Sequence, residues 1–500
     1  MRKYLLALFC GLLFPLGFAP FDYWPLTILS ISLVIYLVTE RVEKNTFLLG
    51  LFYGFGQWGL GISWVYVSIH YHANQGILSS VLITSLFIFS LSLFTGLIFY
   101  LITKLKISNK KLHYLLFFPV VWVTVEVIRS NIFTGFPWLI VGTSLAGTSM
   151  GGWIPILGTY SASILVVMIS GGLVLIFRNK KKIHWSPALI IMIILVSSFT
   201  LNKINWTKEI SIIQASIYQP NLTLKEKWSS EGVRQTMSMI NGSISDAQEG
   251  EFIFFPETAI IVDKEDLYTW ISDIEKEAKS RNISLISGII AKDLQNPGLI
   301  ERYNRIEGFG AIKGHYDKIH LVPFGEYTPI ASFFPDLIQE SGWEAGKSYD
   351  VFPIPSTSNL KMGVAICYES SFPNLVRQFV KKGAVMMGIL TNDAWFEGTS
   401  APIQHLSMSP FRAVENRVPV FRCANGGISC IIDGFGRVLE TQILPENQDG
   451  FLINSITLEN DKKRTIYTLY GDWFPITCFI ISLGLIANLL YQYRNRGRSG

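Results

Sequence analysis

Charged residues are scarce in this chain of 500 residues. Asp, Glu, Lys and Arg make up 16% of the sequence, hydrophobic residues make up 49%, and the mean hydropathy is +0.35. A typical soluble protein carries about 25% charged residues. The composition therefore excludes an entirely soluble globular protein, and the length allows two or three domains.

Cysteine is also rare, and no spacing of Cys and His predicts a metal site. The chain has 5 cysteines, and its 7 histidines are scattered. This cysteine content does not suggest a disulfide framework. Cys423 and Cys430 flank Asn425-Gly426-Gly427, which is typical of a hairpin turn, although an oxidising compartment would permit a disulfide between them. We expect no metal and no cofactor.

The hydrophobic residues cluster in eight stretches of near membrane-spanning length. A transmembrane helix needs roughly 20 apolar residues, with about 17 as the lower limit. The stretches are residues 4–19, 24–39, 46–68, 77–103, 114–128, 153–177, 187–201 and 474–492. We therefore predict seven spans in a transmembrane domain (1–205), a mixed α/β domain (206–472), and an eighth helix with a tail (473–500).

Lys and Arg gather at alternate ends of these stretches, which predicts the orientation in the membrane. Positive charges precede the first span and follow the second, fourth, sixth and last spans, whereas residues 69–76 carry none. Both termini are therefore expected in the cytoplasm, and residues 206–472 outside it. These clusters also account for the net charge of +5, so we expect no nucleic-acid partner.

The first stretch has an alternative interpretation as a cleaved signal peptide, because residues 1–19 begin with Met-Arg-Lys and continue with an apolar run. Phe9 is bulky where a small residue would precede a processed Cys10. We expect residues 4–19 to be the first span.

A possible nucleophile follows a short apolar run of small and β-branched residues. Residues 363–366 end at Cys367, and a helix-like stretch follows over 371–382. Such a strand-to-helix elbow would place the thiol beside a helix N-terminus, where the dipole favours the thiolate. The thiolate is the attacking species. The alternative is a buried, inert cysteine.

Two other apolar strands are followed by charged residues. EFIFFPETAI carries Glu257, and GHYDKIHLVPFGEYTP carries Lys318 and Glu326. A carboxylate, an amine and a thiol can supply a base, a cation for an oxyanion and a nucleophile. The alternative is that Glu257 and Lys318 are solvated surface charges.

The Glu-Lys-Cys set resembles that of the nitrilase superfamily, whose domain is an α-β-β-α sandwich. With eight spans, the whole chain resembles the bacterial apolipoprotein N-acyltransferases. The matching segments are GFPWL (135–139), FPETA (255–259), KIHLVPFGEYTP (318–329), CYES (367–370), NDAWF (392–396), and Gln404-His405 through RAVENR (412–417) to Asn425-Gly426.

This resemblance implies a ping-pong acyl transfer that completes lipoprotein maturation. An acyl chain moves from a phospholipid, typically phosphatidylethanolamine, to the α-amino group of the N-terminal diacylglyceryl-cysteine of an apolipoprotein. We expect a monomer in the bacterial inner membrane, among membrane lipids, with the catalytic domain on the periplasmic side.

In this reaction Cys367 would form a thioester, Glu257 would carry the protons, and Lys318 would stabilise the oxyanion. The expected supporting residues fall into two groups. Glu326 and Glu369 would orient Lys318, or would simply aid solubility, and Trp228, Tyr368 and Trp395 would lie on the substrate side. The alternative for Trp395 is an ordinary core aromatic.

Segment 330–343 is unusually apolar for a surface loop, which suggests a flap that touches lipid. The alternative is an internal packing turn.

Two other functions are compatible with the sequence. One is a membrane-tethered nitrilase or amidase that hydrolyses a small C–N substrate. The other is a transporter or scaffold in which the sandwich only binds.

Overall fold

The computed structural model describes residues 1–40, 45–105, 107, 109–178, 185–204, 206, 209–293, 301–328, 342–355, 357, 359–459 and 464–496. The chain divides into two compact units. The first consists of Met1–Ile204, Thr399–Ser407 and Tyr470–Gly500, and the second consists of Asn205–Gly398 and Met408–Leu469. The sequence did not suggest that residues 399–407 would pack with the first unit. Most of the predicted flap, residues 330–341, lies outside the described residues.

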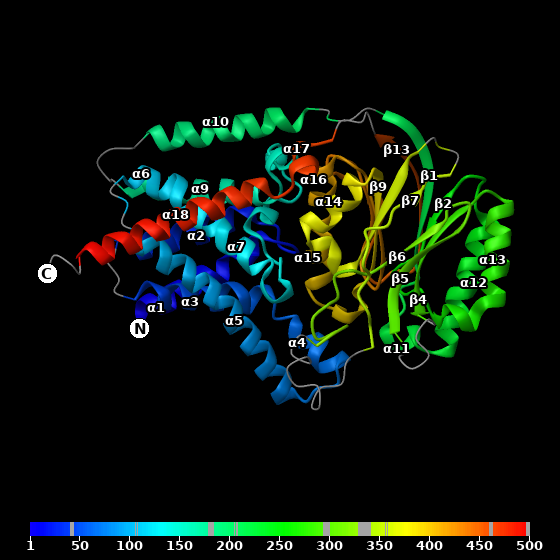
Figure 1. Ribbon diagram of the computed structural model, residues 1–500. Coiled ribbons are helices and arrows are strands. Elements are labelled where there is room, and N and C mark those ends of the chain that lie inside the picture. The colour runs from blue at the N-terminus through cyan, green and yellow to red at the C-terminus, as the bar shows by residue number, and fades with distance from the viewer. Residues whose placement is uncertain are drawn as a thin grey trace. The chain divides into compact units, whose positions relative to one another are not determined.

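The first unit is helical (Figure 1). Its helices are α1 (Arg2–Leu13), α2 (Trp24–Glu40), α3 (Thr46–Gly61), α4 (Val65–Val67), α5 (Ile77–Lys104), α6 (Lys110–Leu112), α7 (Phe118–Arg129), α8 (Ile154–Leu157), α9 (Tyr160–Arg178), α10 (Trp185–Asn202), α15 (Ala401–Leu406) and α18 (Trp473–Arg496).

Within the described residues, 5 helical segments are long and apolar enough to cross a membrane. They are Ile77–Lys104, Lys110–Arg129, Tyr160–Phe177, Trp185–Asn202 and Trp473–Tyr491, and a shorter apolar helix covers Trp24–Thr39. These segments confirm a membrane-type helical region, while the number of eight spans stays a prediction.

The first predicted span is shorter than expected. Helix α1 has 12 residues and ends at Leu13, and a separate 3-10 turn begins at Pro15. Proline lacks the N–H that an α-helix needs at an interior position, so it stops the helix there. Helix α3 in the third stretch has 16 residues.

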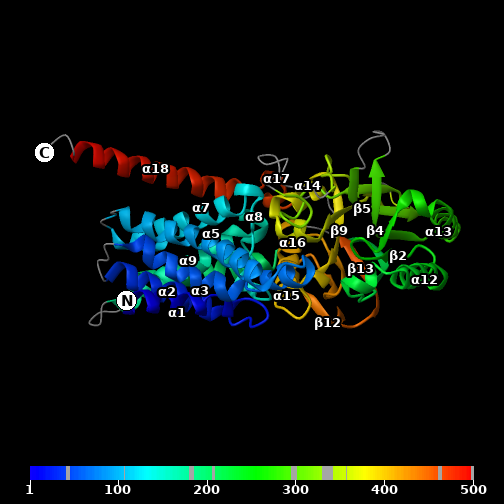
Figure 2. The same cartoon turned by 90° about the horizontal axis from the view of Figure 1, so that it is seen from below.

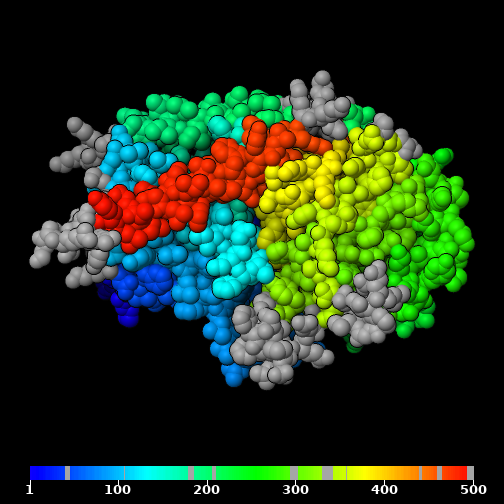
Figure 3. Space-filling view, in the orientation of Figure 1, coloured from blue at the N-terminus to red at the C-terminus, as the bar shows by residue number. Residues whose placement is uncertain are grey.

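Helices α10 and α18 leave most of their apolar surface uncovered. Only 11% of the apolar window of α10 and 17% of that of α18 is buried. Figure 3 shows both helices along the surface of the first unit. Such wide apolar surfaces are typical of helices that face lipid rather than water.

Close helix packing in this unit depends on small residues. A Cβ atom at Gly54 of α3 would lie 2.8 Å from the Cα of Ser92 on α5, and one at Gly56 would lie 2.2 Å from the backbone oxygen of Leu8 on α1. Only glycine allows these backbones to approach so closely, as is usual for helices packed in membranes.

The segment over 399–407 is anchored in the first unit by a buried amide. Gln404 Oε1 accepts hydrogen bonds from Trp64 Nε1 at 3.1 Å and from Trp138 Nε1 at 2.7 Å. Trp138 belongs to the GFPWL segment, so the amide joins two parts of the chain that are far apart in sequence.

The second unit contains two sheets. The strands are β1 (Glu209–Gln219), β2 (Phe252–Phe254), β3 (Ile260–Asp263), β4 (Ser284–Asp293), β5 (Glu301–Gly310), β6 (Gly314–Asp317), β7 (Phe352–Pro353), β8 (Lys361–Ile366), β9 (Ala384–Asn392), β10 (Val420–Asn425), β11 (Ser429–Ile432), β12 (Val438–Leu444) and β13 (Gly450–Glu459). One sheet has the order β13-β1-β2-β4-β5-β6, with β3 paired to β4, and the other has the order β12-β11-β10-β9-β8-β7.

Helices cover the outer faces of both sheets, as Figures 1 and 2 show. Helices α12 (Ser230–Asp246) and α13 (Tyr268–Ser280) pack on the first sheet, where Ile244 and Ile274 join Leu285 in one core. Helices α14 (Pro373–Lys381) and α16 (Ser409–Asn416) pack on the second sheet. The short helices are α11 (Leu224–Lys227) and α17 (Ile466–Tyr470). The predicted α-β-β-α sandwich is confirmed.

The two sheets meet in an apolar interface. Every residue of β9 is buried, which is typical of a central strand with parallel neighbours on both sides. The rings of Phe254 on β2 and Phe421 on β10 stack across the interface with centroids 5.2 Å apart. Strand β2 of this contact leads directly to the segment that carries Glu257.

The predicted hairpin at Asn425-Gly426-Gly427 is present. Strands β10 and β11 pair in antiparallel register, and Gly426 has a φ of +66°, which glycine adopts without strain. All five cysteines, which lie within the described residues, carry free thiols. The disulfide between Cys423 and Cys430 is therefore not formed.

Because Phe421 is fully buried, we expect Phe421→Ala to lower the free energy of unfolding of the sandwich by about 3–5 kcal/mol. Guanidinium unfolding of the full chain in detergent, followed by circular dichroism, measures this change. The control Tyr268→Ala removes an exposed ring and is expected to cost about 0.5 kcal/mol or less. Equal costs for the two variants would contradict this description of the core.

Candidate active site

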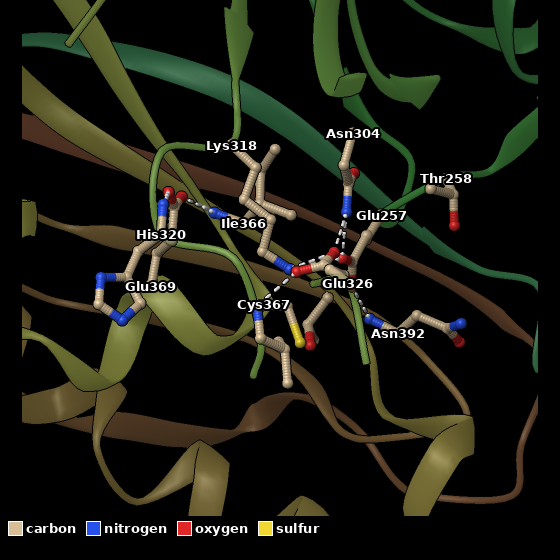
Figure 4. Close-up of polar contacts among 12 residues, drawn as sticks. Glu257, Thr258, Asn304, Lys318, His320, Glu326, Ile366, Cys367, Glu369 and Asn392 are labelled. Carbon is tan, nitrogen blue, oxygen red and sulfur yellow. Dashed lines mark hydrogen bonds and ion pairs between the residues drawn. The ribbon is translucent and has the colours of Figure 1, made fainter. Parts of the chain in front are cut away.

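The candidate site lies where several strands of the two sheets end. Glu257 follows β2 by three residues, Lys318 follows β6 directly, and Cys367 follows β8 directly. Strand β2 is parallel to β4, and β8 is parallel to β9. Figure 4 shows the side chains of Glu257, Lys318 and Cys367 gathered into one cluster. The structure thus brings the predicted residues together.

Cys367 occupies a sharp turn between a strand and a helix. Its backbone has a φ of +50°, a left-handed conformation that is uncommon for residues other than glycine. A 3-10 helix covers Cys367–Ser371, and α14 begins at Pro373, whose fixed φ suits the first helical position. The predicted elbow is confirmed, with the α-helix starting two residues later than expected.

The Lys318 ammonium lies between two carboxylates. Lys318 Nζ donates to Glu326 Oε1 at 2.8 Å and to Glu257 Oε1 at 3.3 Å. Lys318 is 1% exposed and Glu257 is 6% exposed. These two residues are therefore not solvated surface charges, and Glu326 contacts Lys318 directly, as predicted.

Two asparagines hold the Glu257 carboxylate in place. Asn304 Nδ2 donates to Glu257 Oε1 at 2.7 Å and to Glu326 Oε1 at 3.0 Å, and the Asn392 backbone N–H donates to Glu257 Oε2 at 2.8 Å. Asn425 fixes the Asn392 side chain by donating to its Oδ1 at 2.8 Å. Sequence reasoning missed Asn304, which lies within β5 and carries no local signal, whereas Asn392 and Asn425 lie in segments that carry the family resemblance.

Lys318 remains positively charged in this environment. Burial alone would lower the pKa of Lys318, but the carboxylates of Glu326 and Glu257 raise it well above its usual value. The cluster therefore contains a buried cation.

Burial disfavours the thiolate form of Cys367, which opposes the helix-dipole effect expected from the sequence. Burial raises the pKa of Cys367 well above its usual value, and the Glu257 carboxylate raises it further. Lys318 and a hydrogen bond with Thr391 act in the opposite direction without overcoming this effect. The sequence suggested the helix N-terminus but could not show the burial, which here is the larger influence.

Glu369 supports the site through hydrogen bonds to backbone groups close to Lys318 and Cys367 in the sequence. Its Oε1 accepts from the backbone N–H groups of Ile319 and His320 and from the Tyr316 hydroxyl, and its Oε2 accepts from the Ile366 N–H. Burial raises the pKa of Glu369 to about 7, while these donors and Lys318 favour the ionised form. Glu369 therefore links the backbone that follows Lys318 to strand β8, which precedes Cys367. We predicted that Glu369 would orient Lys318, and it does so through the neighbouring backbone rather than through the ammonium.

The three expected substrate-side aromatics differ in exposure. Trp228 is 54% exposed and Trp395 is 41% exposed, so Trp395 is not a buried core residue. Tyr368 is buried and packs against His320 and Phe372. Their contact with a substrate stays a prediction.

In the part of the chain that the structure describes, no group of three or more His, Cys, Asp and Glu residues is arranged to hold a metal ion. The reactive groups seen in the cluster are the thiol, the carboxylates and the ammonium.

Comparison with known proteins identifies the family. The model of the apolipoprotein N-acyltransferase N-terminal domain matches residues 10–172, and the carbon-nitrogen hydrolase model matches residues 210–462. An apolipoprotein N-acyltransferase of Coxiella burnetii is 31% identical over 97% of this chain and 99% of its own length. The chain belongs to the apolipoprotein N-acyltransferase family. Members from Pseudomonas aeruginosa (30% identical, 94% of this chain, 92% of the relative) and Methylococcus capsulatus (29%, 95% and 93%) are similarly related.

Solved structures of other proteins match about half of this chain. Saccharomyces cerevisiae Nit3, a nitrilase-superfamily protein, matches with a TM-score of 0.37 and 19% identity over 53% of this chain and 95% of its own. A carbon-nitrogen hydrolase from Helicobacter pylori matches with a TM-score of 0.38 and 16% identity over 49% and 89%.

The charges around Cys367 predict how its reactivity depends on pH. Lys318→Met removes the cation that lowers the pKa of the thiol, so alkylation of Cys367 should shift to higher pH. Glu257→Gln removes the anion that raises it, so alkylation should shift to lower pH. Each shift should be about 1–3 pH units.

Iodoacetamide incorporation into the tryptic peptide 362–377, in which Cys367 is the only cysteine, measures these rates by mass spectrometry. Lys318→Arg keeps the charge and serves as the control. Shifts of the same sign in Lys318→Met and Glu257→Gln would contradict the electrostatic account.

Proposed function

We propose that this chain transfers an acyl chain from a phospholipid, typically phosphatidylethanolamine, to the α-amino group of the N-terminal diacylglyceryl-cysteine of an apolipoprotein. The observation that carries the proposal is the cluster of Cys367, Glu257 and a buried, charged Lys318. This cluster occurs in a chain with membrane-type helices and full-length similarity to apolipoprotein N-acyltransferases.

In the first half-reaction, Glu257 takes the thiol proton while the Cys367 sulfur attacks the ester carbonyl carbon of the phospholipid. Lys318 stabilises the negative charge on the carbonyl oxygen of the tetrahedral intermediate. The ester C–O bond then breaks, and protonated Glu257 gives its proton to the departing lysophospholipid oxygen. The products are a thioester on Cys367 and a lysophospholipid.

In the second half-reaction, the amine of the lipoprotein attacks the thioester carbonyl carbon. Glu257 accepts a proton from the amine nitrogen, and Lys318 again faces the oxyanion. The C–S bond breaks, and Glu257 returns the proton to the Cys367 sulfur. The amide product leaves, and the thiol and the carboxylate are restored for the next cycle.

The resting electrostatics suit this sequence of steps. A neutral thiol of raised pKa reacts only when Glu257 can take its proton. The Lys318 charge is held by two carboxylates before the substrate arrives, so little reorganisation is needed when the oxyanion forms. Glu326 thereby keeps the ammonium charged and in position.

The location follows from the charge distribution in the sequence. We propose eight spans in the bacterial inner membrane, with seven in residues 1–205 and one in 473–500, and both termini in the cytoplasm. Residues 206–472 would form the periplasmic catalytic domain of a monomer. The exposed rings of Trp228 and Trp395 suit contact with lipid substrates, and Tyr368 would support them from within.

A second candidate is an amidase that hydrolyses a small C–N substrate, which the match of residues 210–462 to the carbon-nitrogen hydrolase model supports. Water would then replace the amine in the second step. The full-length relatives favour acyl transfer, because their similarity includes the membrane helices.

Cys367→Ala should abolish both half-reactions, because no thioester can form. The test is transfer of a labelled acyl chain from phosphatidylethanolamine to a diacylglyceryl-cysteine peptide by the full chain in detergent. Cys430→Ala, at a buried thiol of the same domain, is the control and should retain activity. Activity in Cys367→Ala would exclude the proposed nucleophile, and hydrolysis of small amides without acyl transfer by the unmodified chain would favour the amidase.

Glu257→Gln should slow thioester formation by about 10²–10⁴-fold, because the general base is lost. Single-turnover incorporation of acyl chains into Cys367 measures this step. Asp246→Asn changes a carboxylate at the end of α12 in the same domain and should leave the rate unchanged. A normal rate in Glu257→Gln would show that another group takes the proton.

A further inference from the structure

A second buried lysine touches the loop that carries Glu257. Lys227 is the last residue of α11 and is only 4% exposed. Its Nζ donates to the backbone oxygen of Glu257 at 2.8 Å and to Thr258 Oγ1 at 2.8 Å. Burying an ammonium group costs free energy unless it is hydrogen-bonded or paired. The contacts that Lys227 makes with this loop are therefore the reason to ask what it does there.

The loop that Lys227 holds is conformationally unusual. Thr258 has a φ of +46°, which is rare for a β-branched residue. The loop also crosses β4 closely, since a Cβ at Gly288 would lie 2.3 Å from the Thr258 nitrogen and 2.6 Å from the Pro256 oxygen. Such a backbone persists only when its surroundings hold it, and Lys227 provides two of these contacts.

The start of α11 fixes the position of Lys227. Thr223 and Glu226 form a capping box, in which each side chain binds the other residue's backbone N–H. This short helix therefore presents Lys227 to the loop from an ordered turn.

Lys227 also acts on the reacting groups through its charge. The titratable groups that interact with it are Glu257, after β2, and Cys367, after β8. The Lys318 ammonium pairs with both Glu257 and Glu326. The Asp393 carboxylate raises the pKa of Cys367. Burial lowers the pKa of Lys227 to about 8, while Glu257 and Cys367 oppose this change. The ammonium form therefore predominates at neutral pH.

We propose that Lys227 is a positioning residue for the Glu257 base: its ammonium holds the Glu257–Thr258 backbone through two hydrogen bonds and places a positive charge beside the reacting groups. This inference deepens the proposed function and rests on it. The two lysines then differ in their tasks, because Lys318 binds the Glu257 carboxylate whereas Lys227 binds the backbone behind it.

The test compares Lys227→Met with Lys227→Arg and with Lys225→Met, which removes an exposed lysine from the same helix. The readout is iodoacetamide alkylation of Cys367 in the full chain between about pH 6 and 8, where Lys227 still carries its charge and thiolate formation limits the rate. Lys227→Met should displace the pH profile by about one unit or more toward higher pH, so that alkylation at a given pH slows about tenfold.

Lys227→Arg should keep the profile close to that of the unmodified chain, and Lys225→Met should leave it unchanged. An unshifted profile in Lys227→Met would overturn the proposal. If Lys227→Met does not fold, Lys227→Gln keeps a donor for the two oxygens but lacks the charge, and it should show the same displacement.

A separate arm distinguishes this inference from the proposed function. The unmodified chain is incubated with phosphatidylethanolamine, and the mass of the tryptic peptide 362–377 is measured by mass spectrometry. An acyl adduct with no displacement in Lys227→Met would contradict only the role of Lys227. Displacement without any acyl adduct would contradict the proposed acyl transfer.

Discussion

The Lys318 ammonium, buried between the carboxylates of Glu257 and Glu326, is the interaction on which the site depends. Removing a charged group from water costs several kcal/mol, so the ion cluster is tolerated only because each charge has a partner and further hydrogen bonds. Asn304 supplies one of these bonds to each carboxylate. Loss of Lys318 would leave the two carboxylates without the cation between them, and breaking a buried ion pair in this way typically costs about 3–5 kcal/mol. The cluster therefore joins the ends of separate strands into one structure and holds a buried cation within the site.

In the proposed mechanism, the cluster would also allow a protonated cysteine to serve as the nucleophile. Burial favours the protonated form of Cys367, and the backbone N–H of Asn392 helps to hold the Glu257 carboxylate in position. In the proposed mechanism, this one carboxylate would carry a proton out and back in each half-reaction. Glu369 acts at a distance from this chemistry, since it joins the backbone around His320 to the N–H of Ile366. The reacting groups are thus positioned mainly by contacts to backbone.

Much of this arrangement was predictable from the sequence, because Glu257, Lys318 and Cys367 each follow an apolar strand and the order of these segments resembles a known family. The α-β-β-α fold and the hairpin at Gly426 followed in the same way. The contributions of Asn304 and Lys227 were not predictable, because a polar residue within a strand or a short helix has the same local pattern whether it is buried or solvated. The thiolate prediction failed for a similar reason, since the burial of Cys367 arises from segments distant in sequence.

The most direct test of the central claim is the mass of the tryptic peptide 362–377 after the full chain has been incubated with a defined phospholipid and no acceptor. Cys367 is the only cysteine in this peptide. We predict a mass increase of one acyl chain. Hydroxylamine should remove the added mass, as expected of a thioester. The added mass should also disappear when a diacylglyceryl-cysteine peptide is supplied. An unmodified peptide from a folded chain, under conditions in which the acceptor does become acylated, would contradict it.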